Sequence, residues 1–423
     1  MSGAGGSHGI ARTVRKRTEE QRQQDLNKIS KYRDLEDQIR QQVAQQKYSD
    51  STLLHLTTKL LRLNPEYYTI WNVRRRCLIS GSLSRPSDGS WLSKGSPSTL
   101  ASGTTKLPSA ESSQSPSDAI PRDPKSQTPT RDGQSSSTVN GNGAGDDALQ
   151  QRPETKNDAD VLQSELQFTI PLLLEFPKCY WIWNHRSYIL HLCISHLPVA
   201  QARQVWTAEL GLVSKMLSKD PRNFHAWSYR RKVVAKLESE ELQGTSMAEA
   251  EFAYTRQKIG ENLSNFSAWH NRSQLILKVL AERGADDEAR KRLLEEELDL
   301  ARDGLNLGPE DQSLWYYHQF LMSHILEHID RPTIAPNLTM QERVEYVEKE
   351  IEEIRDLVAD YLDVKWIYQA LLEYSVALEA LKHGQGTTAG DSKSSGETRD
   401  WLAKLKQLDP LRNGRWTDVE NTL

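Results

Sequence analysis

The stretch DPRNFHAWSYRRKVV, residues 220–234, decides the fold, because four other stretches of the chain repeat its pattern around a tryptophan. The other four are NPEYYTIWNVRRRCL (Trp71), FPKCYWIWNHRSYIL (Trp183), NLSNFSAWHNRSQLI (Trp269) and GPEDQSLWYYHQFLM (Trp315). From Trp183 onward the tryptophans lie 44, 42 and 46 residues apart, and a period of this size is typical of stacked helical hairpins. The first spacing is 112 residues, so an insertion separates the first two units.

Each unit carries further residues in phase with its tryptophan. Three residues before it stands an aromatic residue in the first four units and Gln312 in the fifth; the aromatics are Tyr68, Tyr180, Phe224 and Phe266. These aromatics, the tryptophan and an apolar residue seven positions after it are predicted to share one helical face. Three residues after the tryptophan stands an arginine, replaced by His318 in the fifth unit; the arginines are Arg74, Arg186, Arg230 and Arg272. We expect each arginine to stack on its tryptophan or to pair with an acid on a neighbouring helix.

A second amphipathic stretch precedes each tryptophan helix, so each unit is predicted to be a helical hairpin whose apolar face is buried by its neighbours. A sixth, degraded unit is expected around Trp366. Pro171 should bend or break the helix in which it lies. Prolines before four of the tryptophan helices suit a first helical turn, with Asn64 and Asp220 as N-caps. The predicted fold is all-α: a right-handed crescent of stacked antiparallel hairpins, similar to a tetratricopeptide array, with a disordered insertion.

The predicted organisation follows from these patterns. An N-terminal arm and charged helix (1–48) precede the first hairpin (49–80). A Ser- and Pro-rich segment (81–158) is too poor in apolar residues to offset its ordering entropy and is predicted to be disordered. The remaining repeats (159–382), a flexible loop (383–399) and a C-terminal helix (400–423) complete the chain.

Composition excludes several classes of protein. The net charge is −4, so there is no basic surplus of the kind that nucleic-acid binding requires. No stretch approaches the roughly 20 apolar residues of a membrane span, and residues 1–17 do not form a signal peptide. Three scattered cysteines form neither a disulfide framework nor a zinc motif, which favours a reducing, cytoplasmic location.

Each repeat has an aromatic residue three positions before the Trp and an Arg three positions after it. This pattern resembles the repeat of protein prenyltransferase α subunits, over about residues 49 to 330. This resemblance implies a crescent that wraps around a β subunit. The β subunit is then expected to carry zinc and the isoprenoid tunnel, with geranylgeranyl diphosphate as co-substrate. Taken alone, the chain is expected to have no activity.

Within the family, the chain is most similar to the Rab-type α subunits, in a short form like the fungal ones. The similarity lies in the HGI-x-R element at His8, the fourth repeat NFSAWHNRS and the tail LDPLRNGRW. It implies a geranylgeranyl transferase whose substrates are Rab GTPases presented by an escort protein. Two alternatives stay open: the α subunit shared by farnesyl and type I geranylgeranyl enzymes, and a non-enzymatic helical scaffold.

The resemblance also points to three catalytic residues. The motif K-x-Y-x-x-W matches Lys178, Tyr180 and Trp183, and the motif N-x-H-x-W places a histidine at His225. The other units carry Glu66, Arg222, Ser264 and Glu310 where Lys178 stands, so the repeat does not require a lysine there. In the resembling enzymes, such groups contact the diphosphate leaving group. Tyr180 occupies the recurrent aromatic position and is also expected to be a core residue. His8 is a speculative ligand for the partner's zinc.

Overall fold

The computed structural model describes residues 18–84, 153–326, 332–384 and 392–423, and within these ranges the chain forms fifteen α-helices and no β-strand. The five tryptophan units are the helix pairs α2 (Ser51–Leu63) and α3 (Tyr68–Cys77), α4 (Pro153–Glu175) and α5 (Tyr180–His196), α6 (Val199–Lys219) and α7 (Phe224–Leu237), α8 (Ala248–Glu261) and α9 (Phe266–Glu282), and α10 (Asp287–Leu307) and α11 (Gln312–Leu326). A sixth pair follows: α12 (Met340–Asp360) and α13 (Lys365–Gly384). The predicted all-α repeat fold is confirmed.

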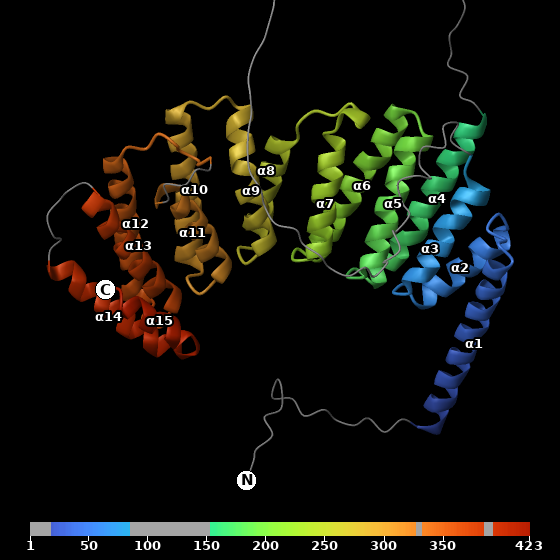
Figure 1. Ribbon diagram of the computed structural model, residues 1–423, viewed down its shortest axis with the longest axis horizontal. Helices are drawn as coiled ribbons and strands as arrows, with labels where there is room; N and C mark the ends of the chain where they lie inside the picture. Colours follow the sequence, from blue (N-terminus) through green and yellow to red (C-terminus); the bar gives the residue numbers. More distant parts are fainter. Residues whose placement is uncertain (1–17, 85–152, 327–331, 385–391) are drawn as a thin grey trace, which may run out of the picture.

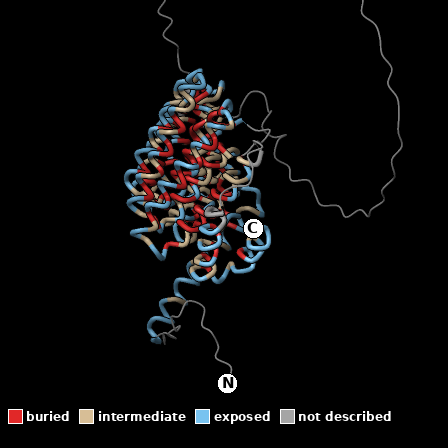
Figure 2. Tube along the Cα trace, turned by 90° about the vertical axis from the view of Figure 1, so that its left-hand side faces the viewer, coloured by how far each residue is buried: buried red, intermediate tan, exposed pale blue. Residues whose placement is uncertain are grey.

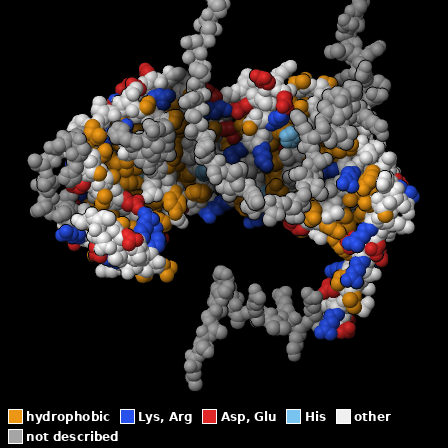
Figure 3. Space-filling model, in the orientation of Figure 1, with side chains coloured by type: hydrophobic (Ala, Val, Ile, Leu, Met, Phe, Trp, Pro, Cys, Tyr) orange, Lys and Arg blue, Asp and Glu red, His pale blue; other side chains and the backbone are white. Residues whose placement is uncertain are grey.

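The helix pairs stand side by side in an arched row (Figure 1). Helix α1 (Glu19–Ala44) projects below one end of the row, and α14 (Ser392–Leu408) with α15 (Asn413–Glu420) lies below the other end. The turns inside the pairs lie along the lower edge of the arch, which faces a hollow between these two projections (Figures 1 and 3). Buried residues form a continuous band along the row between exposed outer surfaces (Figure 2). We call this lower edge the turn edge.

The tryptophans hold each hairpin closed. All five indoles are buried, and each indole N–H donates a hydrogen bond to the carbonyl of the residue six positions earlier, in the turn before the helix. In the third unit, for example, the Trp227 indole nitrogen lies 2.8 Å from the Pro221 carbonyl oxygen. A tryptophan is therefore favoured over a phenylalanine, because it fills the core and also satisfies a buried carbonyl.

The arginines tie each hairpin to the next one. Each of the four forms a two-bonded ion pair with a buried glutamate on the first helix of the following hairpin; the pairs are Arg74–Glu165, Arg186–Glu209, Arg230–Glu251 and Arg272–Glu297. The predicted pairing with a neighbouring acid is therefore observed. Where an arginine also stacks, the ring belongs to the first helix of a hairpin and not to the tryptophan. The Arg230 guanidinium, for example, lies 3.5 Å from the centre of the Tyr254 ring.

Each of these glutamates lies eighteen residues before the tryptophan of its own unit. The same spacing locates the sixth unit, because Glu350 pairs with His318 at 2.8 Å and lies eighteen residues before Tyr368. Tyr368 is buried and donates from its hydroxyl to the Leu362 carbonyl, six positions earlier. Tyr368 therefore replaces the tryptophan of the sixth unit, whereas Trp366, around which this unit was predicted, is only half-buried.

The ion-pair series stops where the repeats stop. The first unit has buried Leu53 at the glutamate position, since no arginine precedes it, and the sixth has buried Leu371 at the arginine position. An unpaired charge at either buried position would be costly. The two terminal units are thus adapted to having only one neighbour in the series.

Two local predictions are wrong. Helix α4 continues through Pro171 to Glu175 and does not break there. Proline has no N–H, so the Gln167 carbonyl lacks the hydrogen bond that residue 171 would donate in a regular helix. Both residues are exposed, so water can bond to this carbonyl instead. Asn64 and Asp220 are C-caps of α2 and α6, not N-caps, because the prolines lie in the turns and the tryptophan helices begin three residues later.

The ends of the predicted segments differ in detail. Ser84 bonds to Asp158 of α4 at 2.9 Å, so both edges of the predicted insertion are folded, and residues 85–152 lie outside the described residues. Helix α14 begins at Ser392, inside the predicted loop 383–399, of which 385–391 are outside the described residues. Two helices stand where one was predicted for 400–423, and buried Trp416 packs them on α13. No helix in the described ranges is long and apolar enough to cross a membrane.

Candidate functional site

Exposed aromatic side chains line the turn edge. Four of them are the first residues of the second helices of the hairpins, and the fifth lies one turn into α11. We call them the aromatic row; its members are Tyr68, Tyr180, Phe224, Phe266 and Tyr316, each between 44% and 64% exposed. Neighbouring rings extend the row, since Trp181 lies 5.3 Å from Tyr68 and Trp366 lies 6.0 Å from Tyr316, centre to centre. An apolar row of this length on a surface is typical of a binding face for another protein.

The prediction that the aromatics share the core face of the tryptophans is therefore wrong. Each of the first four begins its helix, directly after the turn, one helical turn before the buried tryptophan. The partner helix of the hairpin has already ended at this level, so the ring is left exposed within the described part of the chain. Packing in the core therefore does not explain why an aromatic residue recurs at this position. A role at an interface explains it better.

The structure brings two of the three predicted site residues together and places the third beside them. The Tyr180 and His225 rings lie 6.5 Å apart, across the gap between α5 and α7. Lys178 lies in the turn before α5, with its side chain 73% exposed, and its Nζ is 3.9 Å from a carboxylate oxygen of Asp220. All three residues lie on the turn edge, within the aromatic row.

The burial and charges around His225 favour its neutral imidazole form. Partial burial lowers the pKa of His225, nearby Lys178 lowers it further, and Glu66 acts in the opposite direction. A neutral imidazole can donate or accept a hydrogen bond at neutral pH. An ammonium group, a phenol and an imidazole on one surface can together stabilise negative charge that develops on oxygen atoms of a ligand.

Asn223 connects the two turns that carry these residues, and it is a residue that the sequence analysis did not single out. Its side-chain oxygen accepts from the backbone N–H groups of His225 and Ala226, which caps α7. Its amide nitrogen donates to the carbonyl of Pro177, the residue before Lys178, at 3.1 Å. Asn265 has the same capping role in the next repeat, but its buried amide nitrogen has no partner among the described residues.

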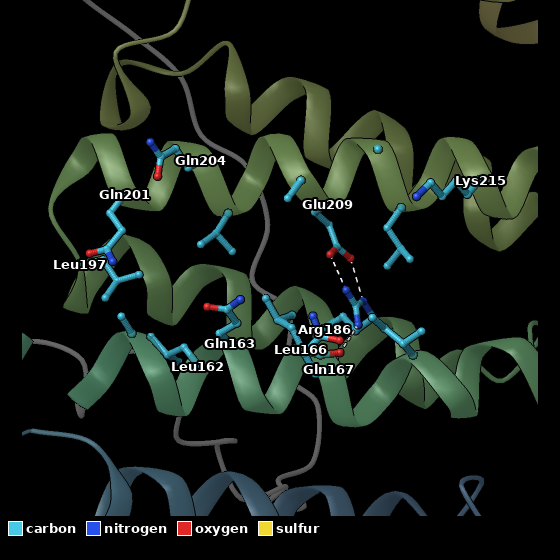
Figure 4. Close-up of a pocket in the computed structure, with 16 residues that line it drawn as sticks. Leu162, Gln163, Leu166, Gln167, Arg186, Leu197, Gln201, Gln204, Glu209 and Lys215 are labelled. Atoms are coloured by element: carbon cyan, nitrogen blue, oxygen red, sulfur yellow. Dashed lines mark hydrogen bonds and ion pairs between the residues drawn. The ribbon is translucent and has the colours of Figure 1, made fainter. Parts of the chain in front are cut away.

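A separate cavity lies elsewhere in the described ranges. It has a volume of about 510 Å³ and lies between α4 and α6, with Leu162 and Leu166 on its apolar wall and Gln163 and Gln204 at its edge (Figure 4). The Arg186–Glu209 pair closes its floor, and none of the three predicted site residues lines it. No three His, Cys, Asp or Glu side chains gather as metal ligands in the described part of the chain, and His8 lies outside that part.

Comparison with known proteins identifies the repeat. The model of the protein prenyltransferase alpha subunit repeat matches five segments, one in each tryptophan unit; they are residues 50–80, 162–193, 206–237, 248–279 and 294–325. The sixth pair, with Tyr368 in place of the tryptophan, is not among the matches.

Two fungal relatives bear the same name, geranylgeranyl transferase type-2 subunit alpha. The one from Schizosaccharomyces pombe is 29% identical over 98% of both chains. The one from Saccharomyces cerevisiae is 32% identical over 60% of this chain and 71% of its own. A solved structure, Candida albicans protein geranylgeranyltransferase-I complexed with GGPP, matches 92% of this chain and 89% of its own with a TM-score of 0.50 and 18% identity, which supports the fold alone.

Proposed function

Because the chain belongs to the protein prenyltransferase alpha-subunit family, we propose that it works as one half of a heterodimer with a prenyltransferase β subunit. Relatives of nearly full length confirm the predicted assignment to the type-2 geranylgeranyl transferase alpha subunits, rather than to the shared α subunit. The aromatic row supports the β-subunit partner, because its rings are exposed in this chain and unexplained by its core. The observation that carries the proposal is this near full-length similarity.

The finer parts of the proposal concern substrates and zinc. We expect geranylgeranyl diphosphate to be the lipid donor and Rab GTPases, presented by an escort protein in the cytoplasm, to be the acceptors. We expect the zinc of such an enzyme to lie on the β subunit, as the family resemblance implies. There it would hold the acceptor cysteine as a thiolate.

The reaction needs one bond to form and one to break. The acceptor thiolate attacks C1 of the isoprenoid, the sulfur–carbon bond forms, and the bond from C1 to oxygen breaks, which releases diphosphate. Negative charge develops on the leaving oxygens. We assign Lys178 and Tyr180 as donors to that charge and His225 as a hydrogen-bonding group that orients the diphosphate, because all three lie on the turn edge.

Transfer assays on purified chains test the function. The chain alone is expected to transfer no lipid, whereas the co-expressed heterodimer should transfer geranylgeranyl to a Rab protein bound to its escort. Modification of a CaaX peptide without an escort protein would contradict the Rab assignment. Failure of any β subunit to co-purify would favour the helical scaffold instead.

Asn223→Asp should slow turnover of the heterodimer by up to about 10²-fold, because small misplacements of reacting groups carry costs of this size. Aspartate retains the cap of α7 but lacks the amide proton that binds the Pro177 carbonyl. The turn that carries Lys178 is then no longer held in place relative to His225. Steady-state kcat and urea unfolding are the measurements. We expect the free energy of unfolding to fall by no more than about 2 kcal/mol.

The matched control is Asn265→Asp, which removes an amide that has no partner in the described structure and retains the same cap. It should leave kcat unchanged. Equal losses in the two variants would mean that Asn223 acts through general stability and not through the position of Lys178.

A further inference from the structure

The cavity between α4 and α6 has no part in the proposed catalytic site. Its volume of about 510 Å³ is typical of sites that hold a small ligand or a few side chains. Leu166 and Leu212 belong to its apolar walls, and the Arg186–Glu209 pair lies at its floor (Figure 4). Gly211 also lines it, and a Cβ atom built there would meet no atom of the described residues within 4 Å. The fold thus leaves room here that its described side chains do not fill.

The other arginine–glutamate junctions show what this space lacks. In each of them the guanidinium lies 3.5 to 4.2 Å from the centre of an aromatic ring; the pairs are Arg74–Phe168, Arg230–Tyr254 and Arg272–Phe252. Arg186 lines the cavity, and no aromatic residue of the described ranges lines it as well. Phe168 and Tyr254 both stand fifteen residues before the tryptophan of their unit, where the third unit has Leu212. The cavity therefore opens at a junction whose arginine has room for a ring.

Side-chain amides lie along the edge of the cavity. Gln163, Gln167, Gln201 and Gln204 line it, and none of the four has a side-chain hydrogen bond to another described residue. An amide carries two donor hydrogens and an acceptor oxygen, so these side chains can bond to the backbone N–H and carbonyl groups of an extended segment. Apolar walls with amides at the edge favour a short peptide segment that carries an apolar side chain.

The chain itself carries such a segment close to the cavity. Ser84 donates its backbone N–H to Asp158 of α4 at 2.9 Å, and Asp158 directly precedes the first residue of α4 that lines the cavity. Trp91 follows Ser84 by seven residues, and Leu92 stands next to it. Trp91 is also the one aromatic residue in the sequence from 85 to 152. The nearest chain outside the described residues thus offers a single ring, and the cavity has room for one.

The length of the chain permits this contact. Seven extended residues span at most about 25 Å. Leu166, whose carbonyl accepts a hydrogen bond from Arg186 at 2.6 Å, lies eight residues along α4 from Asp158, which is about 12 Å. Trp91 can therefore reach the space beside Arg186, and the remaining length is enough to pass around α4, whose diameter is about 10 Å.

We propose that the cavity between α4 and α6 is a docking site for Trp91 of this chain. The indole lies beside Arg186, where the other junctions hold a ring, and the backbone around Trp91 and Leu92 bonds to the glutamine amides. The segment after the first hairpin is then held against the second and third units. This proposal does not depend on the proposed function, because every group in it belongs to this chain.

Limited trypsin digestion of the full 423-residue chain tests the docking. The bond after Lys94, three residues from Trp91, reports on the site, and the bond after Lys106 is the internal reference. We expect Trp91→Ala to speed cleavage after Lys94 roughly tenfold, because proteolysis follows the population of the undocked form and one buried apolar side chain must offset the ordering of its segment. Cleavage after Lys106 should not change. Trp91→Phe, which keeps a ring, should retain most of the protection.

Gly211→Leu tests the cavity itself, because its side chain would occupy the open space that the indole needs. It should speed cleavage after Lys94 as Trp91→Ala does. The matched control is Gly260→Leu in α8, since a Cβ atom at Gly260 also meets no described atom within 4 Å and Gly260 does not line the cavity. This control should leave cleavage after Lys94 unchanged.

Equal cleavage after Lys94 in the wild type and in Trp91→Ala would overturn the proposal. Protection that is lost in Trp91→Ala but survives Gly211→Leu would place the indole elsewhere on the molecule and overturn the assignment to this cavity. Sedimentation of the same variants identifies other occupants. If Gly211→Leu left the cleavage unchanged but dissociated a dimer or released a bound partner, the cavity would hold a second chain in place of Trp91.

Discussion

Lys178→Ala is expected to lower kcat of the heterodimer about 10²-fold or more, which is the typical cost of removing one donor from a developing oxyanion. Of the three proposed groups, Lys178 is the one whose side chain ends in an ammonium group. KM for geranylgeranyl diphosphate should change less than kcat, because the charge on the leaving oxygens grows as the C1–oxygen bond breaks. Single-turnover transfer to a Rab acceptor measures the chemical step directly.

The same change should leave the protein folded and the heterodimer intact. The Lys178 side chain is 73% exposed and its one ion pair, with Asp220 at 3.9 Å, is a surface pair of the kind that contributes at most about 1 kcal/mol. Arg222→Ala is the matched control, since Arg222 holds the same position in the next turn and is also exposed. Unchanged turnover in Lys178→Ala, or an equal loss in Arg222→Ala, would remove Lys178 from the chemistry.

The fold was predictable from the sequence because one residue type marks each unit. A buried indole that bonds back to its own turn imposes the same local geometry wherever it recurs, so five tryptophans in phase define five hairpins. The sequence predicted that each arginine could pair with an acidic residue on a neighbouring helix, but not which acidic residue. Each of these glutamates lies a constant eighteen residues before a tryptophan, and this spacing is visible in the sequence. It identifies the glutamate as the partner only when one knows which helix of the next hairpin faces the arginine.

The candidate site was less predictable than the fold. Periodicity placed Tyr180 and its counterparts on the tryptophan face, but it does not show where the partner helix ends, and that end leaves these rings exposed. The role of Asn223 could not be predicted, because a hydrogen bond from its amide to a carbonyl 46 residues earlier leaves no local sequence pattern. A pattern based on tryptophan does not predict Tyr368, although its hydroxyl donates the equivalent hydrogen bond to the carbonyl six positions earlier.

Arg186→Met is expected to lower the free energy of unfolding by about 3–5 kcal/mol, because it leaves the carboxylate of Glu209 buried without its cation. Both partners are almost fully buried, and Arg186 donates to both Glu209 oxygens, at 2.8 and 2.5 Å (Figure 4). Its remaining nitrogen donates to the Leu166 carbonyl at 2.6 Å, so one side chain joins α4, α5 and α6. Urea unfolding of the full chain, followed by tryptophan fluorescence, measures the loss.

The double variant Arg186→Met/Glu209→Leu should recover much of this loss, since replacing both charges with apolar groups removes the unpaired carboxylate. Arg283→Met is the control with similar bonding but different burial. Arg283 also donates twice to one carboxylate, that of Glu249, at 2.6 and 2.9 Å, yet both side chains are about half exposed. A surface pair of this kind should contribute about 1 kcal/mol or less. If Arg283→Met cost as much as Arg186→Met, burial would not be what makes the repeated arginine–glutamate pairs important. If the double variant were no more stable than Arg186→Met, the loss would come from packing and not from the stranded charge.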